Sequence, residues 1–260
     1  MTPETEMIRL QLESDLSEAQ RYSKEYPQQN YAKALLHFAH GDFERASELL
    51  GAYVEIDAED ARAHYWRGHA LNHLDRHREA VESFTQALRR DTRFFAAVNM
   101  RGRSKRKLGK LEEADSDHTR AIELDPNRPL AHHNLGLAHA DLNLHPEATA
   151  DFSRALELDP QSSSIHHSRG LSRQKLGLIE EALDDLNKAI ELDERFVEAY
   201  VSRGALWNDR KRDPARALRD FDKAIELDPR NVGAHYKRGV ALDSRGDFEG
   251  AIKAYTKAID

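Results

Sequence analysis

Three histidines, His69, His73 and His77, follow one another at intervals of four residues. In a helix, residues four apart lie on one face, so two or three of these imidazoles could point toward one metal ion. No acidic residue completes an obvious ligand set, the chain contains no cysteine, and His77 is expected in a turn. We therefore predict a polar helix face that holds neither a metal nor a cofactor.

The recognised catalytic motifs are missing from the sequence. It contains no GxSxG nucleophile motif, no glycine loop of the kind that binds phosphates, and no HExxH motif. Its many Asp and Glu residues fall at the spacings that give ion pairs along helices. The chain is therefore predicted not to be an enzyme.

Basic residues are concentrated between Arg89 and Lys110, where the only acid is Asp91. A basic run beside Tyr65 and Trp66 suits an acidic peptide, because the rings supply buried area and the cations orient carboxylates. RNA binding by segment 89–110 is one alternative, which the net charge of −7 opposes, and a solvated charge run is another. The run consists of Arg89, Arg90, Arg93, Arg101, Arg103, Lys105, Arg106, Lys107 and Lys110.

Glycines recur along the chain at intervals of 34 or 35 residues, which indicates stacked copies of one structural unit. Each copy reads as two helices, such as 61–74 and 78–91 in the second copy. Small residues suit the close crossing of two helices, and an Asp-Pro pair ends several of the second helices. The recurring glycines are Gly68, Gly102, Gly136, Gly170, Gly204 and Gly239.

The segment LAHHNLGLAHADLNLHPEATADFSRALELDP carries the pattern in full, with Leu135, Gly136, Ala148, Phe152, Ala155 and Pro160 at its repeating positions. These positions resemble the tetratricopeptide repeat (TPR). The resemblance implies an all-α, right-handed superhelical solenoid of antiparallel helix pairs. Its seven copies span 27–60, 61–94, 95–128, 129–162, 163–196, 197–231 and 232–260, preceded by an N-terminal helix at 1–26.

One row departs from the family pattern, because arginine precedes the glycine in five copies where leucine is usual. These residues are Arg67, Arg101, Arg169, Arg203 and Arg238. Acids recur at nearly the same period in the second helices, as Asp117, Asp151, Asp185 and Asp220. We predict that several of the arginines pair with these acids, within a copy or with the next one.

The two ends of the chain differ from the copies between them. Residues 3–25 are predicted to form a helix that resembles the second half of a further copy and caps the stack, with Ile8, Leu12, Leu16 and Ala19 on one face. The last copy has no capping helix after it, so Ile252, Tyr255 and Ile259 are expected to be partly exposed or covered by another chain. A solenoid that self-assembles through this last helix is the alternative function.

The resemblance implies that the first helices line a concave groove in which a peptide lies. The predicted function is a non-catalytic scaffold or adaptor that binds a peptide or protein segment there, with an acidic segment favoured. No signal peptide or membrane span is visible, so a cytoplasmic protein without a membrane partner is expected. The predicted partner-binding residues are Tyr31, Arg62, Tyr65, Trp66, His69, Asn99, Arg103, Arg106, Lys107, His133 and Asn134.

Overall fold

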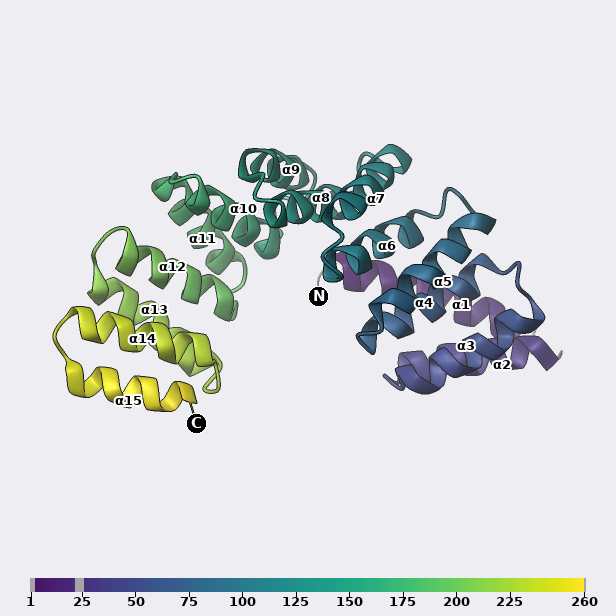
Figure 1. Cartoon of the computed structure of the whole chain (residues 1–260), viewed down its shortest axis with the longest axis horizontal. Helices are drawn as coiled ribbons and strands as arrows, with labels where there is room; N and C mark the ends of the chain where they lie inside the picture. The colour runs from purple at the N-terminus through teal and green to yellow at the C-terminus, as the bar shows by residue number, and fades with distance from the viewer. Residues whose placement is uncertain (1–2, 22–25, 260) are drawn as a thin grey trace. The chain divides into compact units, whose positions relative to one another are not determined.

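The computed structural model describes residues 3–21 and 26–259, which form fifteen α-helices and no strand (Figure 1). The predicted fold class, an all-α solenoid of TPR helix pairs, is confirmed. The chain divides into two compact units, Met1–Leu142 (unit 1) and Asn143–Asp260 (unit 2), and each unit is a stack of packed helices. In the described ranges, no helix is long and apolar enough to span a membrane.

From α2 onward, the even-numbered helices are the first helices of the copies and the odd-numbered helices are the second. Unit 1 contains α1 (Pro3–Arg21), α2 (Tyr26–Ala39), α3 (Phe43–Ile56), α4 (Ala61–His73), α5 (His77–Arg90), α6 (Phe95–Lys107), α7 (Leu111–Leu124) and α8 (Pro129–Asp141). Unit 2 contains α9 (His145–Leu158), α10 (Ser163–Lys175), α11 (Ile179–Leu192), α12 (Val197–Asp209), α13 (Pro214–Leu227), α14 (Val232–Ser244) and α15 (Phe248–Ile259).

The recurring glycines lie where the two helices of a copy touch most closely. A methyl group on Gly68 would stand 2.8 Å from the Phe84 ring, and one on Gly102 would stand 2.7 Å from the His118 ring. Both distances are far below van der Waals contact, so only glycine admits the large side chain that the second helix places there. His118 is fully buried in this row, and burial lowers its pKa to about 4, which keeps the imidazole neutral in the core.

The predicted arginine pairs form in three copies. Arg101 donates to both carboxylate oxygens of Asp117 at 2.9 and 2.6 Å. Two further pairs have the same bidentate geometry, Arg169 with Asp185 and Arg203 with Asp220. In each pair the acid lies on the second helix of the same copy. Bidentate pairing of this kind orients the guanidinium as well as attracting it.

Each of these guanidinium groups also reaches the second helix of the preceding copy. Arg203 donates to Asn187 at 2.8 Å and Arg169 to Ser153 at 3.1 Å, while Arg101 is 3.4 Å from Thr85. One side chain thus joins three helices and sets the register between neighbouring copies.

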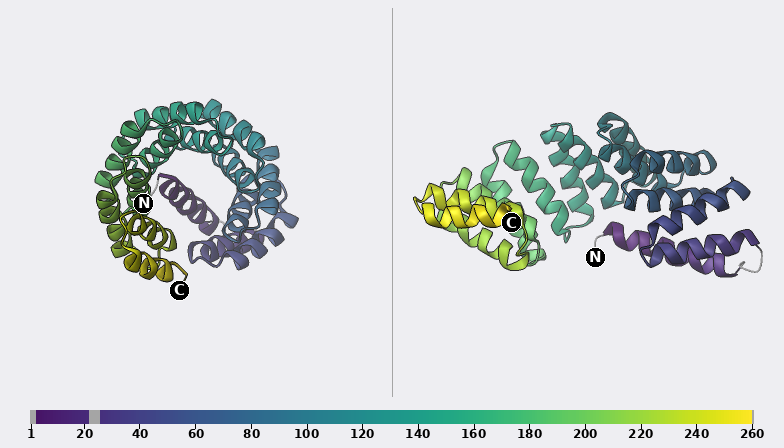
Figure 2. Two further views of the ribbon diagram at one scale, coloured as in Figure 1. Left: turned by 60° about the vertical axis from the view of Figure 1, so that its left-hand side comes forward. Right: turned by 60° about the horizontal axis from the view of Figure 1, so that its bottom comes forward.

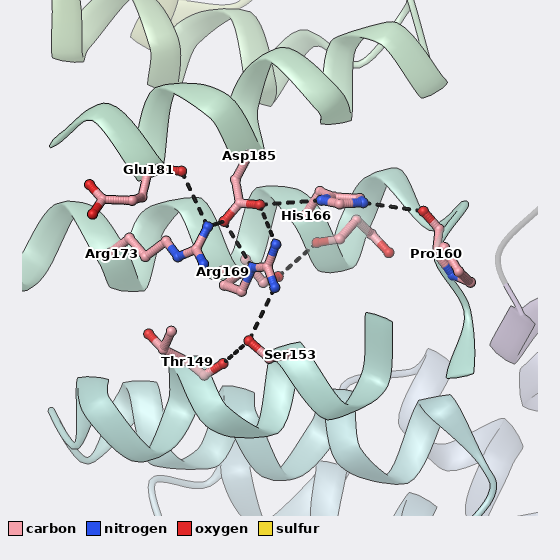
Figure 3. Close-up of polar contacts among 10 residues, drawn as sticks. Thr149, Ser153, Pro160, His166, Arg169, Arg173, Glu181 and Asp185 are labelled. Carbon is pink, nitrogen blue, oxygen red and sulfur yellow. Dashed lines mark hydrogen bonds and ion pairs between the residues drawn. The ribbon is translucent and has the colours of Figure 1, made fainter. Parts of the chain in front are cut away.

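Asp185 collects three cationic or polar donors at the centre of unit 2 (Figure 3). Besides Arg169, it accepts from Arg173 at 2.7 Å and lies 3.3 Å from the His166 ring. Burial by itself would raise the pKa of this carboxyl, but hydrogen bonds from His166 and Arg169 and the charges of both arginines outweigh burial and lower the pKa. The buried carboxylate is therefore kept ionised and holds α10 against α11.

The last helix exposes apolar side chains, as the sequence predicts. Ile252 is 66 % exposed and Ile259 is 87 % exposed, while Tyr255 is partly buried against Tyr236. Phe248, at the start of α15, is also largely exposed. The exposed apolar surface of α15 is therefore formed by Phe248, Ile252 and Ile259.

We expect Gly68→Ala to lower the free energy of unfolding by about 1–3 kcal/mol, because its new methyl group must displace the buried Phe84 ring. Gly51→Ala is the matched control, since its methyl group would meet Arg67 at an ordinary 3.7 Å. In mid-helix, that control should keep or raise stability by up to about 1 kcal/mol. Urea unfolding measures both, and equal stability of the two variants would contradict the close-contact explanation.

Candidate partner-binding groove

Six of the eleven predicted groove residues are buried in unit 1. Tyr65 and Trp66, which were expected to be anchors open to a partner, have no exposed surface at all. The structure corrects that expectation, because both rings belong to the hydrophobic core of the unit. The buried residues are Tyr31, Tyr65, Trp66, His69, Asn99 and Asn134.

Tyr65 is buried because its ring lies between successive helix pairs. The ring centroid is 5.0 Å from that of Phe94 and 5.9 Å from that of Phe84. Tyr31 is covered in a similar way by stacking on Tyr53, with ring centroids 5.1 Å apart. These tyrosines therefore stabilise the stack of copies, and their aromatic surface is used within the chain.

Trp66 is buried because α1 lies over it. Its indole Nε1 donates to Asp15 Oδ2 at 2.6 Å, and Arg62 Nη1 lies 3.1 Å from Asp15 Oδ1. Asp15 is only 1 % exposed, and Gln11 of the same helix donates to it at 2.9 Å. In Figure 2, α1 (purple) lies apart from the stacked pairs, against the inner row of helices in unit 1.

This position differs from the one predicted for α1. A preceding second helix would pack on α2 alone, whereas α1 packs on α2 and also reaches Trp66 and Arg62 of α4. The physical reason is Asp15, which stands on the same face as Ile8, Leu12 and Leu16. A buried carboxylate needs donors, and Trp66 and Arg62 supply them. In the sequence, the position of Asp15 among the apolar residues of one helix face could have indicated this contact. Residues 22–25 of the predicted helix lie outside the described residues.

The two asparagines among the predicted groove residues bond to each other. Asn134 Nδ2 donates to Asn99 Oδ1 at 2.9 Å, and both side chains are buried. His133 is half-buried beside them, and burial followed by the nearby charge of Arg106 lowers its pKa to about 4. This part of the groove face joins the first helices α6 and α8.

An accessible pocket of about 570 Å³ lies between α4 and α6. We call it the α4–α6 pocket, and α1 borders it through Ile8. Three of the predicted residues, His69, Arg103 and Lys107, line it. The remaining lining residues, most of them missed by sequence reasoning, are Asn72, His73, Asp75, His77, Met100 and Ser104.

The positive charge in the α4–α6 pocket comes from Arg103 and Lys107, and Asp75 in the same lining carries a negative charge, while the central histidines are held neutral. Burial lowers the pKa of His69 to about 3, and burial and then Arg103 lower the pKa of His73. His69 is 3 % exposed, and its two ring nitrogens find no hydrogen-bond partner among the residues that the structure describes. His73 stacks flat on Phe43, with centroids 4.0 Å apart. In the described part of the chain, no group of three potential metal ligands is found.

Most of the basic run after Arg89 is paired inside unit 1. Lys105 lies 2.9 Å from Asp117, Arg106 lies 3.0 Å from Asp141, and Lys110 lies 3.0 Å from Glu113. Arg90 donates to the carbonyl oxygen of Ala58 at 2.9 Å. The run is therefore not a continuous free surface, and its contribution to the pocket is limited to Arg103 and Lys107.

Comparison with protein families identifies the repeat. Models described as tetratricopeptide repeat match residues 31–93, 129–162, 163–196 and 209–260, and one described as TPR repeat matches 102–143. Together they cover most of the chain, so it belongs to the tetratricopeptide repeat family. No curated protein matches its sequence. Family membership supports a role as a protein-interaction scaffold.

Solved structures with the same fold include other TPR proteins. A tetratricopeptide repeat protein from Parabacteroides merdae is 22 % identical, with a TM-score of 0.75 over 89 % of this chain and 91 % of that chain. MamA is 24 % identical, with a TM-score of 0.55 over 61 % of this chain and 92 % of that chain. YrrB, described as a TPR protein with an unusual peptide-binding site, is 26 % identical, with a TM-score of 0.53 over 69 % and 92 %.

We expect His69→Phe to reduce the loss of stability on acidification. The folded pKa of His69, about 3, lies below the unfolded value of about 6.5, so protonation favours the unfolded chain as pH falls below 6.5. The wild type should lose on the order of 1 kcal/mol per pH unit through this group between pH 6.5 and 3. The check is urea unfolding at pH 7 and pH 5. A variant whose pH dependence matches the wild type would show that His69 is not held neutral.

Proposed function

We propose that this chain is a non-catalytic scaffold that binds an acidic segment of a partner protein on the first-helix side of unit 1. The observation that carries the proposal is the α4–α6 pocket, in which Arg103 and Lys107 line an accessible cavity of about 570 Å³. Arginine offers a bidentate donor fork to a carboxylate, and lysine adds a second positive charge nearby. A carboxylate-bearing side chain is the ligand that this pair fits.

The pocket combines these charges with apolar surface. Ile8 and Met100 lie in the same lining, so a bound segment would have both its carboxylates and an apolar side chain accommodated. The pocket histidines support binding rather than catalysis, because His69 is buried and neutral and His73 is stacked on Phe43. The similarity to YrrB, whose description names a peptide-binding site, also supports a peptide ligand.

The test is a peptide-display selection against the full chain. Peptides selected by the wild type should be rich in Asp and Glu, and the double charge reversal Arg103→Glu, Lys107→Glu should weaken their binding about tenfold or more, a change of about 1.4 kcal/mol. The matched control reverses two charges on second helices, Arg89→Glu and Arg120→Glu, and should bind as the wild type does.

Two outcomes would contradict the proposal. One is a selection from the wild type without acidic enrichment. The other is equal binding by the pocket variant and the control. Strongly salt-dependent binding of single-stranded RNA, lost in the pocket variant, would instead favour the RNA alternative for residues 89–110.

Self-association through α15 is the second candidate function. It is favoured by the exposed apolar side chains Phe248, Ile252 and Ile259 on one helix. We expect the molar mass from light scattering to rise with protein concentration, and Ile252→Lys to remove that rise, because a charge on the contact face opposes burial. A wild-type mass that is constant and monomeric from micromolar to several hundred micromolar would reject this candidate.

A further inference from the structure

We propose that α1 is a built-in occupant of the groove of unit 1, and that the partner bound there is an acidic amphipathic helix that displaces it. The inference rests on the proposed function and gives the bound segment a conformation and a set of recognition contacts. It also predicts that the partner and α1 compete, because both would bind the same surface of unit 1.

The first observation is the recognition of a carboxylate by the groove. Asp15 is almost fully buried, and Trp66 and Arg62 of α4 hold it at 2.6 and 3.1 Å. The indole N–H is a donor only, and the guanidinium is always charged, so this pair of side chains selects an ionised carboxylate over a neutral or basic group.

The second observation is the apolar face beside that carboxylate. Ile8, Leu12 and Leu16 of α1 are partly buried against the core cluster that includes Trp66 and Phe38. With Asp15, they repeat at intervals of three and four residues, which is one face of a helix. The groove therefore fits a helix that presents one acidic and several aliphatic side chains on the same face.

The third observation is that α1 has an acidic composition and lies beside basic side chains of unit 1. The helix carries five carboxylates, Glu4, Glu6, Glu13, Asp15 and Glu18, against two arginines, Arg9 and Arg21. The groove side offers Arg62 at one end and, beyond Ile8, Arg103 and Lys107 in the α4–α6 pocket. A partner helix of the same charge would be attracted to the same place.

The docked state of α1 is suited to exchange. Burying a carboxylate is costly, and the ion pair offsets that cost without adding much net stability, so apolar residues at this position would hold α1 more tightly. Among the described helices, α1 alone belongs to no helix pair. Because α1 is part of the same chain, its effective concentration at the groove is high, and a partner helix must bind tightly enough to compete with it.

The experiment releases α1 and supplies the same helix in trans. Asp15→Lys in the full chain places a cation against Arg62 and should undock α1. The probe is a fluorescein-labelled peptide of residues 3–21, which should bind this variant at least tenfold more tightly than the wild type, because the wild-type groove is occupied. The same peptide carrying Asp15→Lys should bind neither chain.

The docking of α1 is measured by the fluorescence emission of Trp66. The chain has two tryptophans, so all variants carry Trp207→Phe, which leaves Trp66 as the only emitter. Asp15→Lys should shift the Trp66 emission to longer wavelength, and the unlabelled peptide should reverse the shift. Combining Asp15→Lys with Arg62→Glu should restore docking only in part, because the exchanged charges attract but the Trp66 N–H loses its carboxylate acceptor.

Glu13→Lys is the matched control, since it makes the same charge change on the exposed side of α1. It should leave both the Trp66 emission and the weak binding of the peptide unchanged. Equal affinity of the peptide for the wild type and Asp15→Lys would overturn the inference, as would an unchanged Trp66 emission in Asp15→Lys.

The outcomes separate this inference from the proposed function. Acidic peptides that bind through Arg103 and Lys107 with equal affinity in the wild type and in Asp15→Lys would leave the scaffold proposal standing and reject α1 as a competitor. If acidic peptides bind neither the wild type nor Asp15→Lys, both the proposed function and this inference are rejected.

Discussion

The close contact between a glycine on several of the first helices and a large side chain on the second helix of the same copy is the constraint on which the stack depends. Because Gly68 and Gly102 have no side chain, Phe84 and His118 reach the backbone of the facing helix and fill the space beside the crossing. Where this contact recurs, the helix pairs cross in a similar way and successive copies bury similar surfaces. The imidazole of His118 also fits at this position, because burial keeps it neutral.

Polar side chains then set how one copy follows another. Arg101, Arg169 and Arg203 each join the acid of their own copy to a polar residue on the preceding second helix. Burial of these carboxylates is tolerated because every one has a bidentate partner. Apolar contacts supply most of the stability of such a stack, while the arginine row specifies its register.

The groove of unit 1 uses the same two principles for recognition. Trp66 offers both an apolar face and one N–H, and Arg62 adds a charge at its edge, so α1 is held by burial and by one selected carboxylate. The arrangement explains why the aromatic rings beside these basic residues are covered within the chain. Arg103 and Lys107 lie further along, in the lining of the α4–α6 pocket.

The repeat period determined the all-α class, the glycine at each helix crossing and the arginine–acid pairs. These features depend on residues about 16 apart in neighbouring helices, and a sequence that repeats displays such neighbours many times. Only the tertiary structure decided where α1 lies, which rings it covers and which cations remain accessible. Asp15 and Trp66 are 51 residues apart and meet once, so no period records their contact. The reason is physical: periodic rows report the contacts that every copy shares, whereas the groove is shaped by those that occur in one copy alone.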